Sequence, residues 1–449
     1  MKNPGWWSIF KAKSRQDPIL KIGSIFMIFN KVTLKNGIRL ITVPMPDNPS
    51  VTVLVMVEAG SKYETKNING LSHFLEHMVF KGTERRPKFS DISRELDSIG
   101  ANYNAFTSQE FTGYYAKADL RHLDKVMDIV SDMYLNPIFD IEEIKKEKGV
   151  IIEELRMYKD LPQQHVHDVM AELLHGDQPA GWNVIGTEET INSFTREHFM
   201  TYRKEHYVSD ATIVVVAGSF DESQISLFVD KAFSGISTAQ KKGKLPIKES
   251  QDKPAIRLVF KETDQTHLVI GLRTFPITDK RLPAMRVLTG ILSGGMSSRL
   301  FSKMRDQLGI CYYIRAIHSP ATDHGDLTIS AGVDNSRVEQ GIRGIMEECE
   351  RLKTELVSDE ELKKVKDYIA GTTLLELETS DARAEFSGYQ EVMKRSIESP
   401  AEIIAKTNAV SAEDVRNLAK EIFVNSSLNL AMIGKSKDES GMSEYFKFS

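Results

Sequence analysis

The 449-residue chain has few cysteines, no long hydrophobic run and no large excess of charge of either sign. Its two cysteines, Cys311 and Cys349, are too few for a disulfide framework in a chain of this size. We therefore expect a reducing compartment, or a protein that is indifferent to redox conditions. No apolar run reaches the roughly 18 residues that a membrane-spanning helix requires, so we expect no membrane span.

The charge balance argues against a nucleic-acid partner. The chain has 58 Lys and Arg residues against 63 Asp and Glu residues, a formal charge of −5 at neutral pH. Such a chain has no broad basic field that would attract phosphate backbones, and we expect no binding to nucleic acid. With 41% hydrophobic residues, the composition is typical of a globular enzyme and excludes a disordered chain or a fibre.

Residues 1–27 differ from the rest of the chain. Their apolar groups are scattered among basic residues, without the continuous core and small-residue cleavage site of a signal peptide. Met27 directly precedes a strand-like segment, so we interpret 1–27 as a leader or disordered extension, or as the result of an overcalled start codon. An organelle-targeting segment is the alternative, which Asp17 and Pro18 would interrupt. The predicted location is the cytoplasm of a prokaryote, with an organelle matrix as the alternative.

A hairpin, further strands and several helices are predicted from residue 28 onward. Asn36-Gly37 lies between two strand-like runs, which is the strongest short hairpin signal. An apolar strand is expected over 51–58 and a pair of strands over 101–118. The 3.6-residue periodicity predicts helices over 70–82, 90–99, 121–135, 141–159 and 165–174.

A polar segment divides the chain almost in half. Residues 237–253 contain little apolar surface and are predicted to form a linker between domains at 28–236 and 254–440. The two halves share a short sequence similarity: Ile38-Arg39-Leu40-Ile41 resembles Ile256-Arg257-Leu258-Val259. An apolar strand and then a helix follow each of these segments. This pattern suggests duplicated halves of similar fold, although chance could also supply four similar residues.

The segment His73-Phe74-Leu75-Glu76-His77 predicts a metal site. On a helix, residues i and i+4 lie on one face, so both imidazoles can reach one metal ion, with Glu76 beside them. Catalytic zinc sites usually have three protein ligands and one open position. The alternative is an ordinary amphipathic helix with solvated polar groups. The apolar neighbours weaken that alternative, because unpaired histidine and glutamate beside a core cost free energy that a metal would offset.

The third ligand is expected on the helix predicted over 141–159. Glu147 and Glu154 are seven residues apart in the sequence and therefore share a face of that helix. One carboxylate could bind the metal while the other orients a histidine from behind it.

The segment 70–83 closely resembles the active-site helix of the pitrilysin/insulinase family, in its mitochondrial processing peptidase-like branch. His-x-x-Glu-His is the inverted zinc-binding motif of such peptidases. The resemblance covers about residues 28–435 and continues at Asn104-Ala105-Phe106-Thr107, at Glu147-Lys148-Gly149-Val150-Ile151-Ile152-Glu153-Glu154, at Gly186-Thr187-Glu188-Glu189, at Ser298-Arg299-Leu300-Phe301 and at Arg305-Asp306-Gln307-Leu308-Gly309-Ile310-Cys311-Tyr312.

This resemblance implies a zinc-dependent endopeptidase, in which a glutamate activates a zinc-bound water against peptide bonds of unfolded or short peptides. The implied roles are one zinc ion per chain bound by His73, His77 and Glu154, a catalytic base, Glu76, and a supporting acid, Glu147. Glu153 is the competing third ligand. It would point about 100° away from Glu154 around the helix, so it would share the face of Glu147 less well.

The implied fold is α+β. Two homologous α/β-roll halves, each a mainly antiparallel sheet with helices on one side, would form a clam-like chamber. The first half would be catalytic. The second half is expected to be non-catalytic, because its helix over 282–292, which matches the zinc helix in order, contains neither histidine nor glutamate.

The resemblance implies that two further features contact the substrate. Arg305 and Tyr312, seven residues apart, match a pair that contacts the substrate near the scissile bond. The strand around Asn104, Ala105 and Phe106 resembles an edge strand that pairs with an extended peptide. The alternatives are an exposed helix arginine, a core tyrosine and an ordinary core strand.

A second hypothesis comes from a different class of protein. Some relatives of this kind are non-catalytic structural or partner subunits of a processing-peptidase-like complex, although every expected ligand is present here. An unrelated metal-dependent hydrolase is a third hypothesis, which the long match disfavours. A homodimer, or a heterodimer with a related subunit, is compatible with either of the first two hypotheses.

Overall fold

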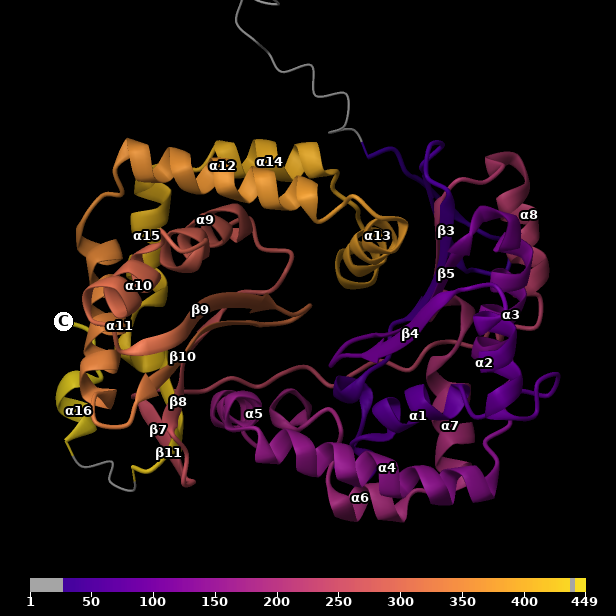
Figure 1. Cartoon of the computed structure of the whole chain (residues 1–449), viewed down its shortest axis with the longest axis horizontal. Coiled ribbons are helices and arrows are strands. Elements are labelled where there is room, and N and C mark those ends of the chain that lie inside the picture. Colours follow the sequence, from indigo (N-terminus) through magenta and orange to yellow (C-terminus); the bar gives the residue numbers. More distant parts are fainter. Residues whose placement is uncertain (1–26, 437–440) are drawn as a thin grey trace, which may run out of the picture.

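The computed structural model describes residues 27–436 and 441–449. The expected leader over 1–27 lies outside the described residues, apart from Met27, which is buried. Two α/β units face each other in Figure 1, with the first half of the chain on the right and the second half on the left. Each unit is built on a mainly antiparallel sheet, in agreement with the predicted α+β fold. No described helix combines the length and the apolar character needed to cross a bilayer.

The first sheet has the strand order β1-β2-β6-β3-β5-β4, and its neighbours are antiparallel except for the parallel pair of β2 and β6. Strands β3 and β6 are buried almost throughout, as expected for strands that are covered on both faces. The strands are β1 (Asn30–Thr33), β2 (Arg39–Pro44), β3 (Ser50–Val57), β4 (Asn102–Thr107), β5 (Thr112–Asp119) and β6 (Thr212–Gly218). The helices are α1 (Leu71–Val79), α2 (Phe89–Asp97), α3 (Leu123–Leu135), α4 (Ile141–Asp160), α5 (Pro162–His175), α6 (Glu188–Ser193), α7 (Arg196–His206) and α8 (Glu222–Ala232).

The second sheet has the strand order β7-β11-β8-β10-β9, again with one parallel pair, β7 and β11. The strands are β7 (Ala255–Phe260), β8 (Gln265–Thr274), β9 (Cys311–Pro320), β10 (Gly325–Asp334) and β11 (Leu428–Gly434). The helices are α9 (Leu282–Ser293), α10 (Arg299–Phe301), α11 (Val338–Thr354), α12 (Asp359–Leu375), α13 (Ser380–Lys394), α14 (Pro400–Asn408), α15 (Ala412–Ile422) and α16 (Met442–Tyr445).

Apart from β1, the two sheets share one topology. In each sheet the first strand lies beside the last strand and parallel to it, and the second, fourth and third strands follow. The predicted duplication is therefore confirmed by the arrangement of strands. The predicted hairpin is also present: Gly37, with a positive φ of 99° that favours glycine, lies in the turn between β1 and β2.

Each half supplies one helix to the sheet of the other half. Helix α5 packs on β8 and β11 of the second sheet, and α13 packs on β3 and β6 of the first. Glycines allow both helices to approach closely. A Cβ at Gly271 would lie 2.4 Å from the sulfur of Met170, and a Cβ at Gly388 would lie 2.5 Å from the sulfur of Met56. The second face of each sheet is thus covered by a helix encoded in the other half.

The predicted linker runs between the two halves and contacts both. Residues 238–254 form neither helix nor strand, and Lys244 pairs with Glu110 of the first half and Asp323 of the second. The tips of the two hairpins β4–β5 and β9–β10 meet here, because the Glu110 carboxylate accepts hydrogen bonds from the Thr322 backbone N–H and hydroxyl, both at 2.8 Å. The domain boundaries at 28–236 and 254–440 stay a prediction.

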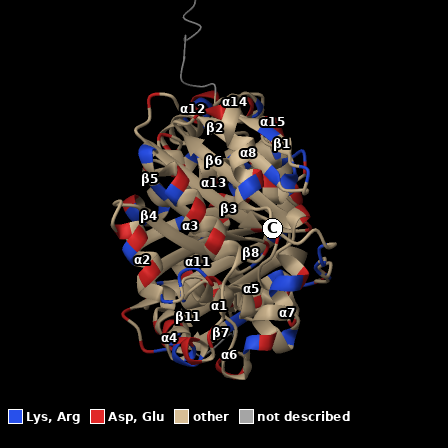
Figure 2. Ribbon diagram, turned by 90° about the vertical axis from the view of Figure 1, so that its right-hand side faces the viewer, with Lys and Arg blue, Asp and Glu red and all other residues tan. Residues whose placement is uncertain are grey.

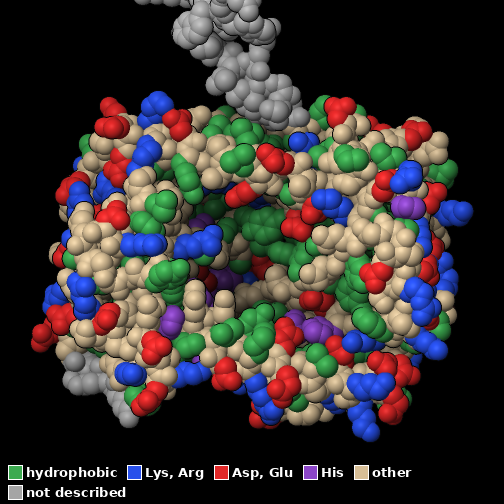
Figure 3. Space-filling model, viewed as in Figure 1, with side chains coloured by type: hydrophobic (Ala, Val, Ile, Leu, Met, Phe, Trp, Pro, Cys, Tyr) green, Lys and Arg blue, Asp and Glu red, His purple; other side chains and the backbone are tan. Residues whose placement is uncertain are grey.

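The space between the halves is open to one face of the molecule. Figure 3 shows a deep hollow there, with hydrophobic and histidine side chains visible inside it. In the side view of Figure 2, basic and acidic residues are interspersed over the ribbon and form no field of a single sign. This distribution agrees with the near balance of charge in the sequence.

Candidate metal centre

Helix α1 is held at its N-terminus by a glycine and a buried carboxylate. Gly70 precedes the helix with a φ of 97°, and a Cβ there would lie 2.2 Å from the carbonyl oxygen of Ile185. The Glu64 carboxylate accepts hydrogen bonds from the backbone N–H groups of Gly70 at 2.8 Å and Ser72 at 2.6 Å. Burial raises the pKa of Glu64 to about 7. Because these two hydrogen bonds satisfy N–H groups at the helix N-terminus, Glu64 fixes the start of the helix that contains the two histidines.

The residues of α1 are divided between the core and a polar site. Leu71, Phe74, Leu75 and Met78 are buried in the core of the first half. The remaining positions of the motif lie toward α4, against which α1 packs. The helical spacing in the sequence therefore predicts correctly which side of α1 is polar.

Three side chains from α1 and α4 come together beside this polar side. Nε2 of His77 lies 3.5 Å from Oε2 of Glu154, and Nε2 of His73 lies 3.8 Å from Oε1 of the same carboxylate. Glu153 points elsewhere, since its side chain is 73% exposed and pairs with Arg156 at 2.8 Å. Of the two candidate third ligands, Glu154 is the one whose carboxylate faces both imidazoles.

Glu147 lies behind His77 and determines its orientation. Oε1 of Glu147 lies 3.0 Å from Nδ1 of His77, and Oε2 lies 2.6 Å from Nζ of Lys81. Burial acts to raise the pKa of Glu147, but the hydrogen bonds from His77 and Lys81 outweigh it and hold that pKa below its ordinary value. Because the carboxylate only accepts, Nδ1 of His77 bears the hydrogen, which leaves Nε2, on the side of Glu154, as the nitrogen that can bind a metal ion. Burial acts to lower the pKa of His77, but Glu147, Glu154 and Glu76 together raise it above its ordinary value.

His73 is buried, Glu76 is half-buried, and both are incompletely paired. Within the described part of the chain, Oε2 of Glu76 and Nδ1 of His73 have no hydrogen-bond partner. Burial raises the pKa of Glu76 above its ordinary value, and the Thr107 side chain, at the end of β4, acts in the opposite direction. Burial also lowers the pKa of His73 to about 3. His73 is therefore a neutral imidazole at physiological pH.

The three side chains fit a zinc ion. Ligand atoms around a tetrahedral zinc, with bonds of about 2.0–2.1 Å, lie about 3.4 Å apart. The two separations measured from Glu154 are 3.5 and 3.8 Å, and one ligand atom from each of the three residues lies within 4.8 Å of the others. Two imidazoles and one carboxylate also form a donor set that is common in catalytic zinc sites.

Strand β4 forms the outer edge of the first sheet, next to α1. It pairs with β5, with Asn104 opposite Tyr115 and Ala105 opposite Tyr114, and no other described strand lies on its second edge. Asn104 is exposed and Ala105 is buried, while Phe106 is half-buried. The free backbone groups of an edge strand can pair with an extended chain. Substrate binding by these residues stays a prediction.

Arg305 and Tyr312 lie in the second half and contact each other. The Arg305 guanidinium lies 5.6 Å from the centre of the Tyr312 ring and 5.1 Å from that of Phe301. Tyr312 is 74% exposed, which contradicts the alternative of a core tyrosine. No contact among the described residues joins this pair to the histidines of α1, and Figure 1 places α1 and the second sheet on opposite sides of the molecule. Their contact with a substrate stays a prediction.

Three residues near the centre are not indicated by the sequence patterns. Lys81 follows His77 by four residues, so helical spacing is a signal that could have identified it. Glu64 contacts the helix start across a loop, where no periodic signal exists. Thr107 ends the motif around Asn104, but its proximity to Glu76 depends on how the first sheet packs against α1.

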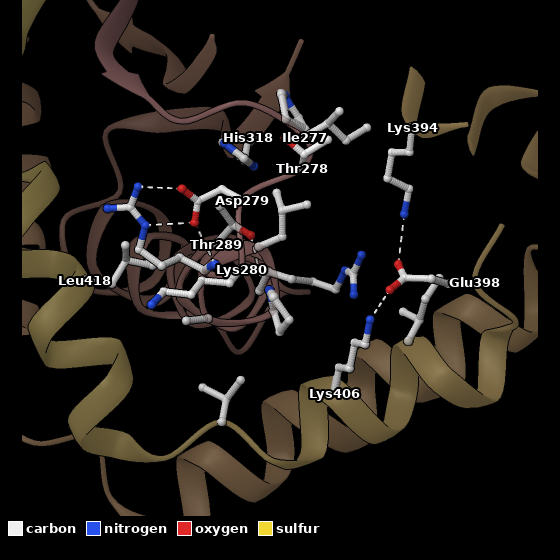
Figure 4. Close-up of a pocket in the computed structure, with 18 of the residues that line it drawn as sticks. Ile277, Thr278, Asp279, Lys280, Thr289, His318, Lys394, Glu398, Lys406 and Leu418 are labelled. Carbon is white, nitrogen blue, oxygen red and sulfur yellow. Dashed lines mark hydrogen bonds and ion pairs between the residues drawn. The ribbon is translucent and has the colours of Figure 1, made fainter. Parts of the chain in front are cut away.

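A cavity of about 1270 Å³ lies in the wall of the second half. Figure 4 shows Lys394 and Lys406 on either side of Glu398, from the segments α13 and α14 and the connection between them. His318, on β9, lines another part of the same cavity. None of the residues predicted to bind metal or substrate is among its lining residues, so the cavity is separate from the metal centre.

The sequence matches two profiles of one peptidase family. Residues 39–188 match the profile described as Insulinase (Peptidase family M16), and residues 193–369 match that described as Peptidase M16 inactive domain. The protein named uncharacterized zinc protease YmxG, from Bacillus subtilis, is 35% identical over 397 residues, which are 88% of this chain and 96% of that protein. An uncharacterized zinc protease from Rickettsia felis is 34% identical over 407 residues, 90% of this chain and 97% of that protein.

Solved structures share the fold over nearly the whole chain. A protease from Helicobacter pylori has a TM-score of 0.85 at 22% identity and covers 91% of this chain and 99% of its own. A chain of complex III2 from Candida albicans has a TM-score of 0.81 at 16% identity, covering 93% of this chain and 98% of its own. At such identities the likeness shows the fold alone.

Proposed function

Because the chain belongs to the insulinase family, peptidase family M16, we propose that it is a zinc-dependent endopeptidase. The observation that supports this proposal most directly is the convergence of His73, His77 and Glu154, whose ligand atoms lie within 4.8 Å of one another. The half-buried Glu76 belongs to the same turn of α1 as His77. Relatives named zinc proteases, at about one-third identity, agree with this activity.

The proposed site holds one zinc ion per chain. His73 and His77 would bind it through Nε2, and Glu154 through its carboxylate. When bound, zinc polarises the peptide carbonyl and lowers the pKa of a bound water toward about 7. Glu147 holds the His77 ring in the binding tautomer through Nδ1, and Lys81 keeps Glu147 ionised and in place.

Glu76 is the proposed general base. Its carboxylate accepts a proton from the attacking water while the water oxygen bonds to the peptide carbonyl carbon. It then donates this proton to the amide nitrogen as the carbon–nitrogen bond breaks. Burial raises the pKa of Glu76, which makes it a stronger base than an exposed glutamate and brings it closer to the pH at which the enzyme works.

The proposed substrate is an extended peptide that adds to the edge of the first sheet. Asn104, Ala105 and Phe106 would bind it through the free backbone groups of β4. A folded protein rarely offers a free extended segment, so unfolded proteins and short peptides are the expected substrates. Arg305 and Tyr312 are proposed to contact the peptide from the second half. The processing-peptidase-like branch, the dimeric state and the prokaryotic cytoplasmic location stay predictions.

Zinc content and cleavage of a quenched peptide test this proposal together. We expect Glu76→Gln to retain zinc and lose cleavage, because the base is removed while the ligands remain. We expect Glu154→Ala to lose both zinc and cleavage. Glu153→Ala is the matched control on the neighbouring position and should lose neither. Full cleavage by Glu76→Gln would refute the base, and unchanged zinc in Glu154→Ala would refute the choice of third ligand.

The second candidate function is that of a non-catalytic partner subunit. The fold, which is shared with a chain of complex III2 from Candida albicans, is compatible with this alternative. Under this alternative, the purified wild-type protein would cleave no peptide even when loaded with zinc, and it would co-assemble with a related chain. The complete set of His73, His77, Glu154 and Glu76 favours the enzyme.

A further inference from the structure

A second cluster of metal-binding side chains lies where the two halves meet. His175 ends α5 of the first half, while His324 and Asp326 lie at the start of β10 in the second half. One ligand atom from each lies within 4.8 Å of the others, and the side chains of His175 and His324 are 2% and 3% exposed. We propose that these three residues bind a second divalent transition-metal ion, which joins the two halves.

The shortest contact of His324 favours the tautomer that can bind a metal ion through Nε2. Nδ1 of His324 has two polar neighbours, Oδ1 of Asp323 at 2.8 Å and Nζ of Lys62 at 3.3 Å. The Asp323 carboxylate also pairs with Lys62 at 2.6 Å and Lys244 at 3.1 Å. The shorter contact is with the carboxylate, which only accepts, so it favours the tautomer with the hydrogen on Nδ1 and the lone pair on Nε2. Asp323 thus has the same relation to His324 as Glu147 has to His77 in the first site.

The hydrogen bond between His175 and Asp326 leaves two buried atoms unsatisfied. Nε2 of His175 lies 2.8 Å from Oδ2 of Asp326, and this contact alone would explain the pair as an ordinary link between the halves. However, Oδ1 of Asp326 and Nδ1 of His175 are buried without a hydrogen-bond partner among the described residues. Buried orphan atoms of this kind are uncommon in folded proteins.

A metal ion would use these groups more completely. A shared ion requires the His175 nitrogen and the Asp326 oxygen to move apart to about 3.3 Å, a small rotation for Asp326, whose side chain is 17% exposed. The His175 and His324 rings have centres 4.8 Å apart in a T-shaped arrangement with an interplanar angle of 73°, and one nitrogen of each ring lies within 4.8 Å of the other ligand atoms. Two imidazoles and one carboxylate select zinc, cobalt or nickel over the hard cations magnesium and calcium.

Such an ion would cross-link elements that meet only in the folded chain. It would attach the end of α5 to the strand that follows the β9–β10 tip. That tip already contacts Glu110 of the first half through Thr322. The ion would therefore stabilise the relative position of the two halves, a structural role that does not depend on the proposed peptidase activity.

The test measures bound metal after the first site has been removed. His73→Ala/His77→Ala protein is equilibrated with zinc, desalted and analysed by mass spectrometry of the metal. We expect one ion per chain, and a rise in unfolding temperature with zinc. Adding His175→Gln, which keeps a donor for Asp326, should abolish both effects while circular dichroism remains unchanged. His267→Ala, a histidine of the second half that bonds to Tyr313, is the matched control and should retain the ion.

Cobalt provides a spectroscopic signature for the same variants, because cobalt bound by these three side chains absorbs in the visible range and free cobalt absorbs far more weakly. Absence of metal from the His73→Ala/His77→Ala protein would overturn the proposal, and so would retention of the ion by the variant that also contains His175→Gln. If the first site were not a zinc site, wild type and His73→Ala/His77→Ala would bind the same amount. The two proposals therefore fail on different results.

Discussion

Replacing Glu147 by glutamine isolates the contribution of the carboxylate behind His77. The Glu147 side chain is 6% exposed and accepts hydrogen bonds from Nδ1 of His77 at 3.0 Å and from Nζ of Lys81 at 2.6 Å. Glutamine keeps the size of the side chain but loses the charge and one acceptor. If its oxygen stays with His77, its amino group faces the Lys81 ammonium, and two donors then meet in a buried site.

Loss of such a supporting partner lowers metal affinity about 10- to 100-fold, which corresponds to about 1.4–2.7 kcal/mol. We expect the upper part of this range for Glu147→Gln, because the variant also creates the unfavourable contact with Lys81. At saturating zinc, kcat should approach that of wild type, since Glu147 positions a ligand and does not touch the substrate. An effect on affinity with little effect on saturated kcat distinguishes this role from that of Glu76.

The assay is competition for zinc against a chelator of known affinity at constant pH, followed by peptide cleavage in excess zinc. Glu153→Gln is the control, because it makes the same chemical change on the same helix at an exposed position paired with Arg156. Zinc affinity of Glu147→Gln within about twofold of wild type would refute the reasoning, because the expected loss is at least about tenfold. An equal loss in Glu153→Gln would do the same.

Three further predictions concern stability. Met170→Ala removes a side chain that packs on the other half's sheet and should lower the free energy of unfolding by about 2–5 kcal/mol, measured by urea titration against Met170→Leu; equal midpoints would contradict it. Glu64→Gln puts a donor against the N–H groups that start α1 and should cost about 1–3 kcal/mol; an unchanged unfolding temperature would exclude this role. Burial opposes ionisation of Asp132, but hydrogen bonds from Thr83 and Arg86 outweigh it and hold its pKa below 3.8. The stabilisation that ionised Asp132 contributes is therefore complete above that ordinary value and is lost as pH falls through the lower folded pKa. In urea titrations between neutral pH and acid, the free energy of unfolding should fall less for Asp132→Asn than for wild type; a fall as large as in wild type would rule this out.

Much of the secondary structure follows from local signals in the sequence. The predicted helices over 121–135, 141–159 and 165–174 correspond to α3, α4 and α5. The turn at Asn36-Gly37 is found where its chemistry predicts it. These elements are predictable because helical periodicity and turn residues act over a few neighbouring positions.

The exchange of helices between the halves could not be predicted in this way. Helix α5 has an apolar face, including Val166 and Met170, that is buried against Val269 of the second sheet. Periodicity identifies such a face but not its partner. The partner is about a hundred residues away in the sequence, and only the arrangement of both sheets brings the two together.

The same distinction applies to the candidate site: residues on one helix are predictable from the sequence, and contacts between distant elements are not. His73, Glu76 and His77 belong to one helix, and Glu147 and Glu154 belong to another, so each group follows from helical geometry. The sequence does not show that α1 and α4 face each other, and this had to be assumed from the resemblance. Arg305 and Tyr312 depend on the position of the second half. The contact of Glu64 with the helix start and the walls of the large cavity have no periodic signal at all.

The exchanged helices also determine when the first half can be completed during synthesis. Strand β6 ends at Gly218, whereas α13, which covers the second face of its sheet, begins at Ser380. The ribosome must add 380 − 218 = 162 residues between these two events. At about 5–20 residues per second, this takes roughly 8–32 s. During that interval the apolar face around Met56 and Val215 has no native cover, and transiently exposed hydrophobic surface of this kind is what chaperones bind.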